Sequence, residues 1–247
     1  MDLDPIYELP GGSSVIPPAR SAQARHALIV AGIKEFSERG VDGASARRVA
    51  EMAGQNVAAV TYYFGGKEGL YLAIATYAAE TVMRRSAPLL DEIEAYLARP
   101  NPAPAQCLRF LQQMLNGTLV GSDALFALSQ LIVREQTHPT AAFDVLFRGA
   151  LARHHELGTA LIAAYAGGPA DDAEFVIHYH LLLGSVLGLR VARETLLRRT
   201  GWSDIGDAER SQISQLLSEH VASVVRGLRT QRRRRVSDRP SKPGSHR

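Results

Sequence analysis

The sequence predicts an all-α fold, and three observations support this. Apolar residues recur at helical spacing along most of the 247 residues, no stretch alternates apolar and polar residues as a half-buried strand does, and Gly- or Pro-rich breaks separate the periodic segments. The chain is 46% hydrophobic and 21% charged, as is ordinary for a globular protein. A chain of this length buries about 70–75% of its unfolded surface, so it needs no disulfide or metal to fold.

Three short helices are predicted between an N-terminal arm and a longer helix that begins near residue 67. Residues 1–20 contain four prolines and no periodicity, which is typical of a flexible arm. The three helices are bounded by glycines and by polar residues suited to N-caps. Their predicted ranges are 21–39, 45–53 and 57–64.

Helical periodicity continues along the rest of the chain. The predicted segments are 67–85, 105–120, 123–136, 140–166, 171–199 and 207–229. Residues 230–247 read as a basic disordered tail rich in Arg, Pro and Ser. Arg134 and Glu135 are adjacent charges in an otherwise apolar segment, where a solvated pair is favoured over a buried one.

The charge is unevenly distributed. The net charge is +3, but residues 230–247 hold seven basic and one acidic side chain, which leaves −3 for the remainder. Residues 20–67 carry +3 and residues 68–229 carry −3. A basic N-terminal module followed by an acidic body is consistent with a polyanion-binding head, although solvated helices are often as basic.

The first three helices have the spacing of a helix-turn-helix, with the turn at Gly54. A helix that enters a major groove about 12 Å wide needs a small outer face. The sequence VAAVTYYF provides one, because Ala58 and Ala59 are small while Val60 and Phe64 are placed to face the core. This pattern predicts DNA binding by the helix over 57–64.

The stretch SARRVAEMAGQNVAAVTYYFGGKEGLYLAI resembles the DNA-binding domain of TetR-type repressors, and REQTHPTAAFDVLF and GSVLGLRVARETLLRRTGW resemble its CecR-type branch. The resemblance covers most of residues 21–229. It implies a DNA-binding domain over 21–67 and a helical effector-binding and dimerisation domain over 68–229. The implied function is a ligand-responsive cytoplasmic repressor that binds a near-palindromic double-stranded operator as a homodimer and is released by a small molecule.

The resemblance also implies roles for individual residues. Arg47 would read a base edge, and Val57, Ala59 and Thr61 would face bases; Ser45 would cap the second helix and touch a phosphate. Tyr62, Tyr63 and Lys67 occupy positions that correspond to phosphate contacts. The start of the third helix at Asn56 is suited to a further phosphate contact, and Gln55 would add a polar contact. Tyr62 and Tyr63 have an alternative reading as core aromatics of a helical bundle.

A dimer face is expected on the last two long helices. Gly184 and Gly188 would allow close approach of a second helix, and Leu217, Val221 and Val224 would supply an apolar stripe. From the residues alone, packing within one chain is the more frequent explanation of both features, and the resemblance favours the dimer. No effector-binding residue is assigned.

Other functions are less well supported. The single cysteine, Cys107, excludes an intrachain disulfide, and the pairs His154-His155 and His178/His180 lack metal-site spacing, so no metal or cofactor is expected. The apolar run over 181–189 is too short to span a bilayer, and no membrane association is expected. One alternative is an all-helical enzyme, but the sequence contains no recognisable catalytic motif. Another alternative is non-specific DNA binding by the arginine-rich tail.

Overall fold

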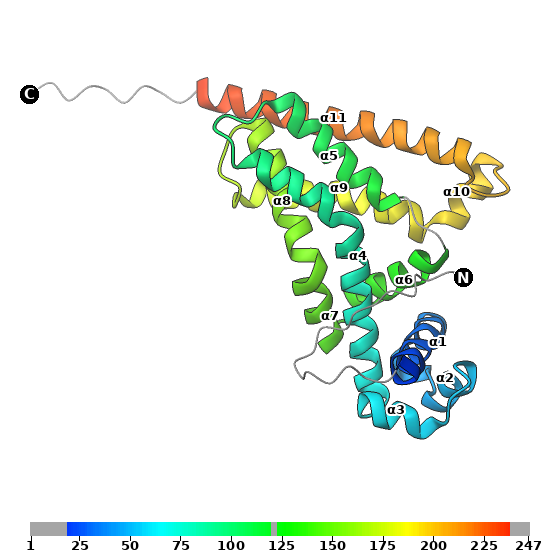
Figure 1. The fold of residues 1–247 in the computed structure, drawn as a ribbon. Helices are drawn as coiled ribbons and strands as arrows, with labels where there is room; N and C mark the ends of the chain where they lie inside the picture. Colours follow the sequence, from blue (N-terminus) through cyan, green and yellow to red (C-terminus); the bar gives the residue numbers. More distant parts are fainter. Residues whose placement is uncertain (1–18, 120–122, 238–247) are drawn as a thin grey trace, which may run out of the picture. The chain divides into compact units, whose positions relative to one another are not determined.

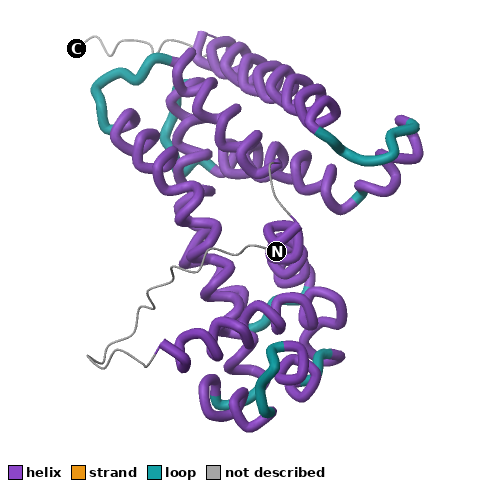
Figure 2. The backbone as a smooth tube through the Cα atoms, turned by 45° about the vertical axis from the view of Figure 1, so that its right-hand side comes forward, coloured by secondary structure: helices purple, strands orange, loops and turns teal. Residues whose placement is uncertain are grey.

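The computed structural model describes residues 19–119 and 123–237, which form helices joined by short loops, with no strand in this part of the chain (Figures 1 and 2). The all-α prediction is therefore confirmed. The α-helices are α1 (Ala19–Gly43), α2 (Ala46–Met52), α3 (Val57–Phe64), α4 (Lys67–Leu97), α5 (Pro104–Leu119), α6 (Asp123–Thr137), α7 (Ala141–Leu146), α8 (Ala152–Ala166), α9 (Ala173–Val191), α10 (Arg193–Thr200) and α11 (Asp207–Ser237). A single π-helical turn, η1 (Phe147–Leu151), joins α7 to α8.

The chain divides into two compact units. Unit 1 comprises residues up to Arg85 together with Gly121–Ala152, and unit 2 comprises Ser86–Val120 and the residues from Arg153 onward. Unit 1 therefore contains α1–α3, the first part of α4, and the later helices α6 and α7. The predicted domain limits, 21–67 and 68–229, concern function and remain a prediction.

Buried polar groups join α6 and α7 to α4 inside unit 1. The Glu135 carboxylate is buried and accepts hydrogen bonds from the Tyr71 hydroxyl at 2.6 Å and from the backbone N–H of Thr140 at 2.9 Å. Burial, followed by the bond to Glu135, raises the pKa of Tyr71 well above its usual range. The favoured reading of Arg134 and Glu135 as a solvated pair is thus wrong for Glu135, because its carboxylate has three donors inside the unit.

In unit 2, helix α5 packs against both α11 and α9. Polar side chains fix the register of α5 on α11: the Asn116 amide donates to Ser218 Oγ at 2.9 Å, and Ser214 Oγ donates to Asn116 Oδ1 at 2.7 Å. Gly158 of α8 lies against the ring of Tyr179 of α9, where a Cβ atom would meet a ring carbon at 2.0 Å. This contact requires a glycine at residue 158.

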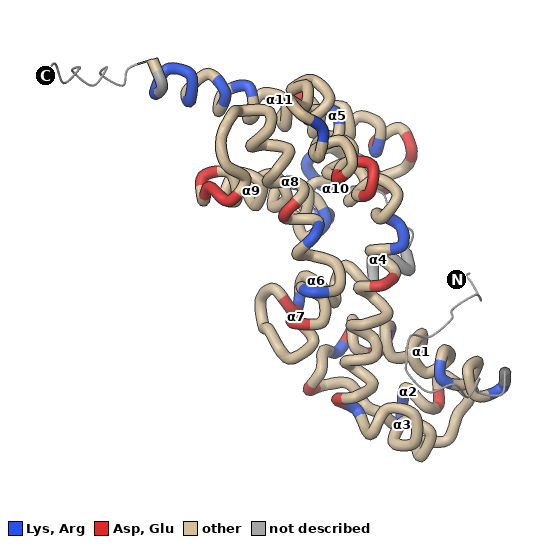
Figure 3. Tube along the Cα trace, turned by 60° about the vertical axis from the view of Figure 1, so that its left-hand side comes forward, with Lys and Arg blue, Asp and Glu red and all other residues tan. Residues whose placement is uncertain are grey.

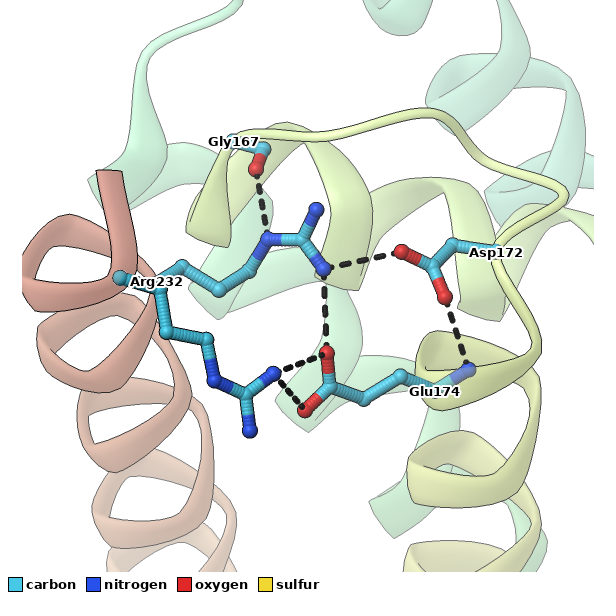
Figure 4. A network of polar contacts seen from close by, with 5 residues as sticks. Gly167, Asp172, Glu174 and Arg232 are labelled. Atoms are coloured by element: carbon cyan, nitrogen blue, oxygen red, sulfur yellow. Dashed lines mark hydrogen bonds and ion pairs between the residues drawn. The ribbon is translucent and has the colours of Figure 1, made fainter. Parts of the chain in front are cut away.

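The predicted tail is helical over its first eight residues, because α11 continues to Ser237. The expectation of disorder over 230–247 is wrong for this part, and residues 238–247 lie outside the described residues. Arg232 explains the difference: it donates to the Gly167 carbonyl at 3.0 Å and forms ion pairs with Asp172 at 2.9 Å and Glu174 at 3.1 Å (Figure 4). Similarly, Ala19 and Arg20 of the predicted arm form the first turn of α1, and residues 1–18 are not described.

Helix α9 has an unusually apolar exposed surface. Among the described helices, it alone has the length and apolar composition that a bilayer span requires, criteria that core helices of globular proteins also meet. Its exposed face carries Ile177, Leu181 and Val191, with Gly184 and Gly188 between them. These five residues, which we call the α9 stripe, are spaced by three or four and therefore lie on one side of the helix.

Candidate nucleic-acid interface

Helix α2 begins at a cap that two side chains complete. Ser45 is the N-cap, and its Oγ accepts the backbone N–H of Arg48 at 3.4 Å, as the sequence predicted. The backbone N–H of Ser45 donates to Oε1 of Glu35 at 3.3 Å. In a capping box, a Glu three residues into the helix makes the second bond. Here that position holds Arg48, and Glu35 of α1 supplies the carboxylate instead.

The turn between α2 and α3 has the predicted glycine. Gly54 adopts a φ of 65°, a left-handed conformation that favours glycine over other residues. Asn56 then caps α3, with its side-chain oxygen accepting the N–H of Ala58 at 2.9 Å. Gly65, with a φ of 75°, ends the helix. Residues 45–65 therefore form the predicted helix-turn-helix.

The side chains of α3 divide between the core and solvent. Val60 is buried and Phe64 is half-buried, both packed in the core of unit 1. The Tyr62 side chain is 82% exposed, and Thr61 is exposed beside it. The core-aromatic reading is therefore wrong for Tyr62. It fits Tyr63 better, since that half-buried ring packs against the unit 1 core.

The other predicted DNA-contacting residues differ in their freedom to bind. Val57 is exposed, whereas Ala59 and Gln55 are half-buried. Arg47 is exposed and forms an ion pair with Glu51 at 3.1 Å, one turn further along α2. Lys67 donates from Nζ to the Val41 carbonyl at 2.9 Å, so this ammonium group ties α4 to the end of α1.

Charge in this part of unit 1 lies around α3 and not on it. Helix α3 contains no Lys, Arg, Asp or Glu, whereas α1, α2 and the start of α4 carry both signs (Figure 3). The exposed surface of α3 therefore consists of small, apolar and hydroxyl-bearing side chains.

No cluster of Glu35, Arg39 and Arg48 is predicted from the sequence, which favours Arg48 as a solvated side chain. Glu35 is buried, and its carboxylate lies 3.4 Å from Arg39 Nε and 3.1 Å from Arg48 Nε. One signal was available: α2 has two arginines and no acid in its first turn, where a carboxylate is favoured, so an acid from another helix is well placed there.

The residues predicted for the dimer interface include both exposed and buried ones. Gly184 and Gly188 are exposed, with open space where a Cβ atom would lie. Leu217 and Val221 are buried in the core of unit 2, where α11 packs on α5, and Val224 is half-buried. The same chain already covers the side chains of Leu217 and Val221, which favours the exposed glycines of α9 over these residues, and the dimer interface itself stays a prediction.

Comparison with known families gives two matches that together span most of the chain. Residues 28–74 match the family described as bacterial regulatory proteins, tetR family, and residues 104–228 match the C-terminal domain of the HTH-type transcriptional dual regulator CecR. The HTH-type transcriptional dual regulator CecR of Shigella flexneri is 37% identical over 213 residues, which cover 85% of this chain and 94% of that protein.

Solved structures share the fold at lower identity. HlyIIR, a hemolysin II transcriptional regulator, has a TM-score of 0.55 at 16% identity, covering 82% of this chain and 97% of its own. A protein of Pseudomonas aeruginosa PAO1, likewise described as a transcriptional regulator, has a TM-score of 0.59 at 16% identity, covering 85% of this chain and 94% of its own. At these identities the similarity concerns the fold alone.

Proposed function

Since the chain belongs to the TetR family of DNA-binding transcriptional regulators, with a C-terminal domain of the CecR type, we propose that it is a ligand-released repressor that binds a near-palindromic operator as a homodimer. Helix α3 is the recognition helix, and Val57, Ala59 and Thr61 face the bases. Arg47 reads a base edge with its guanidinium fork. The remaining contacts are made to the DNA backbone and fix the register of the protein on the duplex. They come from Ser45, Gln55, Asn56, Tyr62, Tyr63 and Lys67.

The observation that carries this proposal is the surface of α3. Tyr62 and Thr61 are exposed at the end of a helix with a small, uncharged face, although tyrosine side chains are on average partly buried. An α-helix with such a face fits the major groove, and the preceding helix of the motif crosses the phosphate backbone.

The α9 stripe supports the dimer. Its exposed Ile177, Leu181 and Val191 lie along one side of a helix, and Gly184 and Gly188 allow the backbones of two such helices to approach closely. Two copies would double the number of base contacts and present two recognition helices about 34–36 Å apart, one turn of DNA. The dimer face proposed here is thus α9, in place of the buried residues of α11.

Release follows from linkage. A small molecule that binds the C-terminal helices more tightly in a state unfit for DNA weakens DNA binding, and DNA weakens its binding by the same factor. The protein acts in the cytoplasm, where both the operator and a permeating small molecule are present.

Selection of bound duplexes from random DNA by the full-length protein tests the proposal. The selected site should be an imperfect inverted repeat. Gel-shift titration should then show that Arg47→Ala and Tyr62→Ala each weaken binding to that site by about tenfold or more, because each removes a contact to the duplex. Unchanged affinity in both variants would remove the assigned reading face.

A matched control is available in unit 2. Arg198 forms the same kind of exposed pair with Glu194, four residues earlier, at 2.9 Å. Arg198→Ala removes the same charge and the same type of ion pair, so it should leave affinity for the selected site unchanged.

A further inference from the structure

A buried carboxylate near the start of α2 holds two arginines at once. Glu35 of α1 is 1% exposed, and its two oxygens contact Arg39 and Arg48. A buried carboxylate is normally balanced by a single cation or by several hydrogen bonds. One carboxylate cannot neutralise two guanidinium groups, so this cluster retains one positive charge at the surface.

The way in which the arginines are held matters more than their number. Both contact Glu35 through Nε, at 3.4 Å for Arg39 and 3.1 Å for Arg48. A carboxylate at Nε occupies the edge that Nε shares with one Nη group, which leaves the outer edge, formed by the two Nη groups, free to donate. The side chains are 45% and 52% exposed, so both arginines reach the surface of unit 1.

Two such guanidinium groups, fixed at one side and free at the other, are suited to phosphate. Arginine binds phosphate oxygens with two parallel N–H donors, and an arginine that is already oriented loses less side-chain entropy on binding. Arg48 lies in the first turn of α2, the helix that crosses the DNA backbone in helix-turn-helix proteins.

We propose that Arg39 and Arg48 form a phosphate clamp on the DNA backbone, and that Glu35 is a positioning residue that orients both guanidinium groups. The clamp rests on the proposed function, since it needs the face of α2 and α3 to meet DNA. It adds two backbone contacts to those assigned above and carries no sequence information, because phosphates are the same at every base pair.

The test uses the full-length protein, the duplex recovered by selection, and a scrambled duplex of equal length, each at several salt concentrations. Arg48→Ala should weaken binding to both duplexes by about tenfold and lower the slope of log affinity against log salt by about 1. Arg39→Ala should act in the same direction. Arg47→Ala should weaken binding to the selected duplex only, so that the clamp and the reading face fail independently.

Lys34→Ala is the charge control. Lys34 is exposed on α1 next to Glu35, yet forms no ion pair with it. A diffuse effect of positive charge would make Lys34→Ala resemble Arg48→Ala, and this result would overturn the clamp. So would an unchanged salt slope in Arg48→Ala.

The positioning role is tested by a double-mutant cycle. Glu35→Gln should weaken binding severalfold in the otherwise native protein and by less than twofold when Arg39 and Arg48 are both alanine. An equal loss in both backgrounds would mean that Glu35 acts only through the stability of unit 1, and would overturn the positioning role. Arg48→Lys keeps the charge but has no Nε–H, so it should not recover native affinity, whereas full recovery would contradict the need for orientation. This comparison holds even if Glu35→Gln unfolds.

Discussion

His154 and Tyr179 form a hydrogen-bonded pair in unit 2 that links stability to pH. The Tyr179 hydroxyl lies 2.6 Å from His154 Nδ1, and burial, followed by repulsion from His155, lowers the pKa of His154 to about 4. Because the folded protein favours the neutral imidazole, the unfolded chain binds the proton first. The stabilising effect is complete above the unfolded pKa of about 6.5 and is lost as the pH falls toward 4.

We expect the free energy of unfolding to fall by about 1–2 kcal/mol between pH 7.5 and pH 5 through His154. Urea titration at the two pH values measures this difference. His154→Gln keeps an acceptor for Tyr179 but cannot titrate, so it should lose most of the dependence. His138→Gln, at an exposed site, should keep it. If both variants respond to pH as the native chain does, the titrating group lies elsewhere.

At the residue scale, local chemistry was predictable and distant partners were not. Ser45 and Asn56 were recognised as caps because their acceptors reach N–H groups two or three residues away. Glu135 and Tyr71 are 64 residues apart, and Glu35 reaches Ser45 across a turn. Neither contact leaves a local pattern, so the buried acids of unit 1 were visible only in three dimensions.

At the element scale, the limits of α2 and α3 followed their glycines, whereas α1 continues past Gly40 to Gly43 and α4 continues past Pro88 to Leu97. Gly54 and Gly65 end helices where the sequence predicted. The division between α9 and α10 at Ala192 was missed, because alanine is a strong helix former and nothing local marks its non-helical conformation. The extension of α11 was missed because its arginines read as solvated charges until their acidic partners on α9 were in place.

The packing of α8 on α9 predicts opposite effects of one substitution at two glycines. Gly158→Ala should destabilise the protein by about 1–3 kcal/mol, since its Cβ would overlap the Tyr179 ring. Gly117→Ala in α5 has open space around it and should stabilise by about 0.5–1 kcal/mol through helix propensity. The test compares the thermal unfolding temperatures of the two variants with that of the native chain. Similar shifts of this temperature in both variants would contradict the packing argument.

Two arginines connect the end of α11 to the start of α9, and Arg232 makes more of these contacts than Arg235, which pairs with Glu174 at 3.3 Å. Besides its two ion pairs, the Arg232 guanidinium lies 4.6 Å from the centre of the Phe175 ring. Arg232→Ala should speed amide hydrogen exchange over residues 230–237, because these contacts hold the last turns to α9. Arg233→Ala, at an exposed neighbouring site, is the control. Unchanged exchange in Arg232→Ala would show that the helix end is stable without this network.

At the scale of the whole molecule, the α9 stripe predicts that single chains associate. Leu181, which is 60% exposed, lies near its middle. Leu181→Lys should give a monomer by sedimentation velocity while leaving helix content unchanged, because a buried unpaired charge opposes association. Phe147→Lys places the same charge on an exposed apolar residue of unit 1 and should leave the assembly intact. A monomeric native chain would exclude the dimer.

The sequence predicted the all-helical class and the helix-turn-helix because both depend on short-range periodicity and caps. The sequence did not distinguish between the two candidate dimer faces. The α11 stripe and the glycine pair of α9 are equally apolar in sequence, and only the packing of α11 on α5 shows that one is covered and the other is not.

The absence of charge on α3 separates where the protein binds from how tightly it binds. In the proposed complex, the side chains of α3 exchange no counterions, whereas the phosphate contacts of Arg39 and Arg48 do. Raising the potassium concentration of the cell should therefore lower the affinity for every site by a similar factor and leave the order of affinities among genomic sites unchanged. Osmotic stress would then change how strongly this regulator binds DNA without changing which sites it prefers.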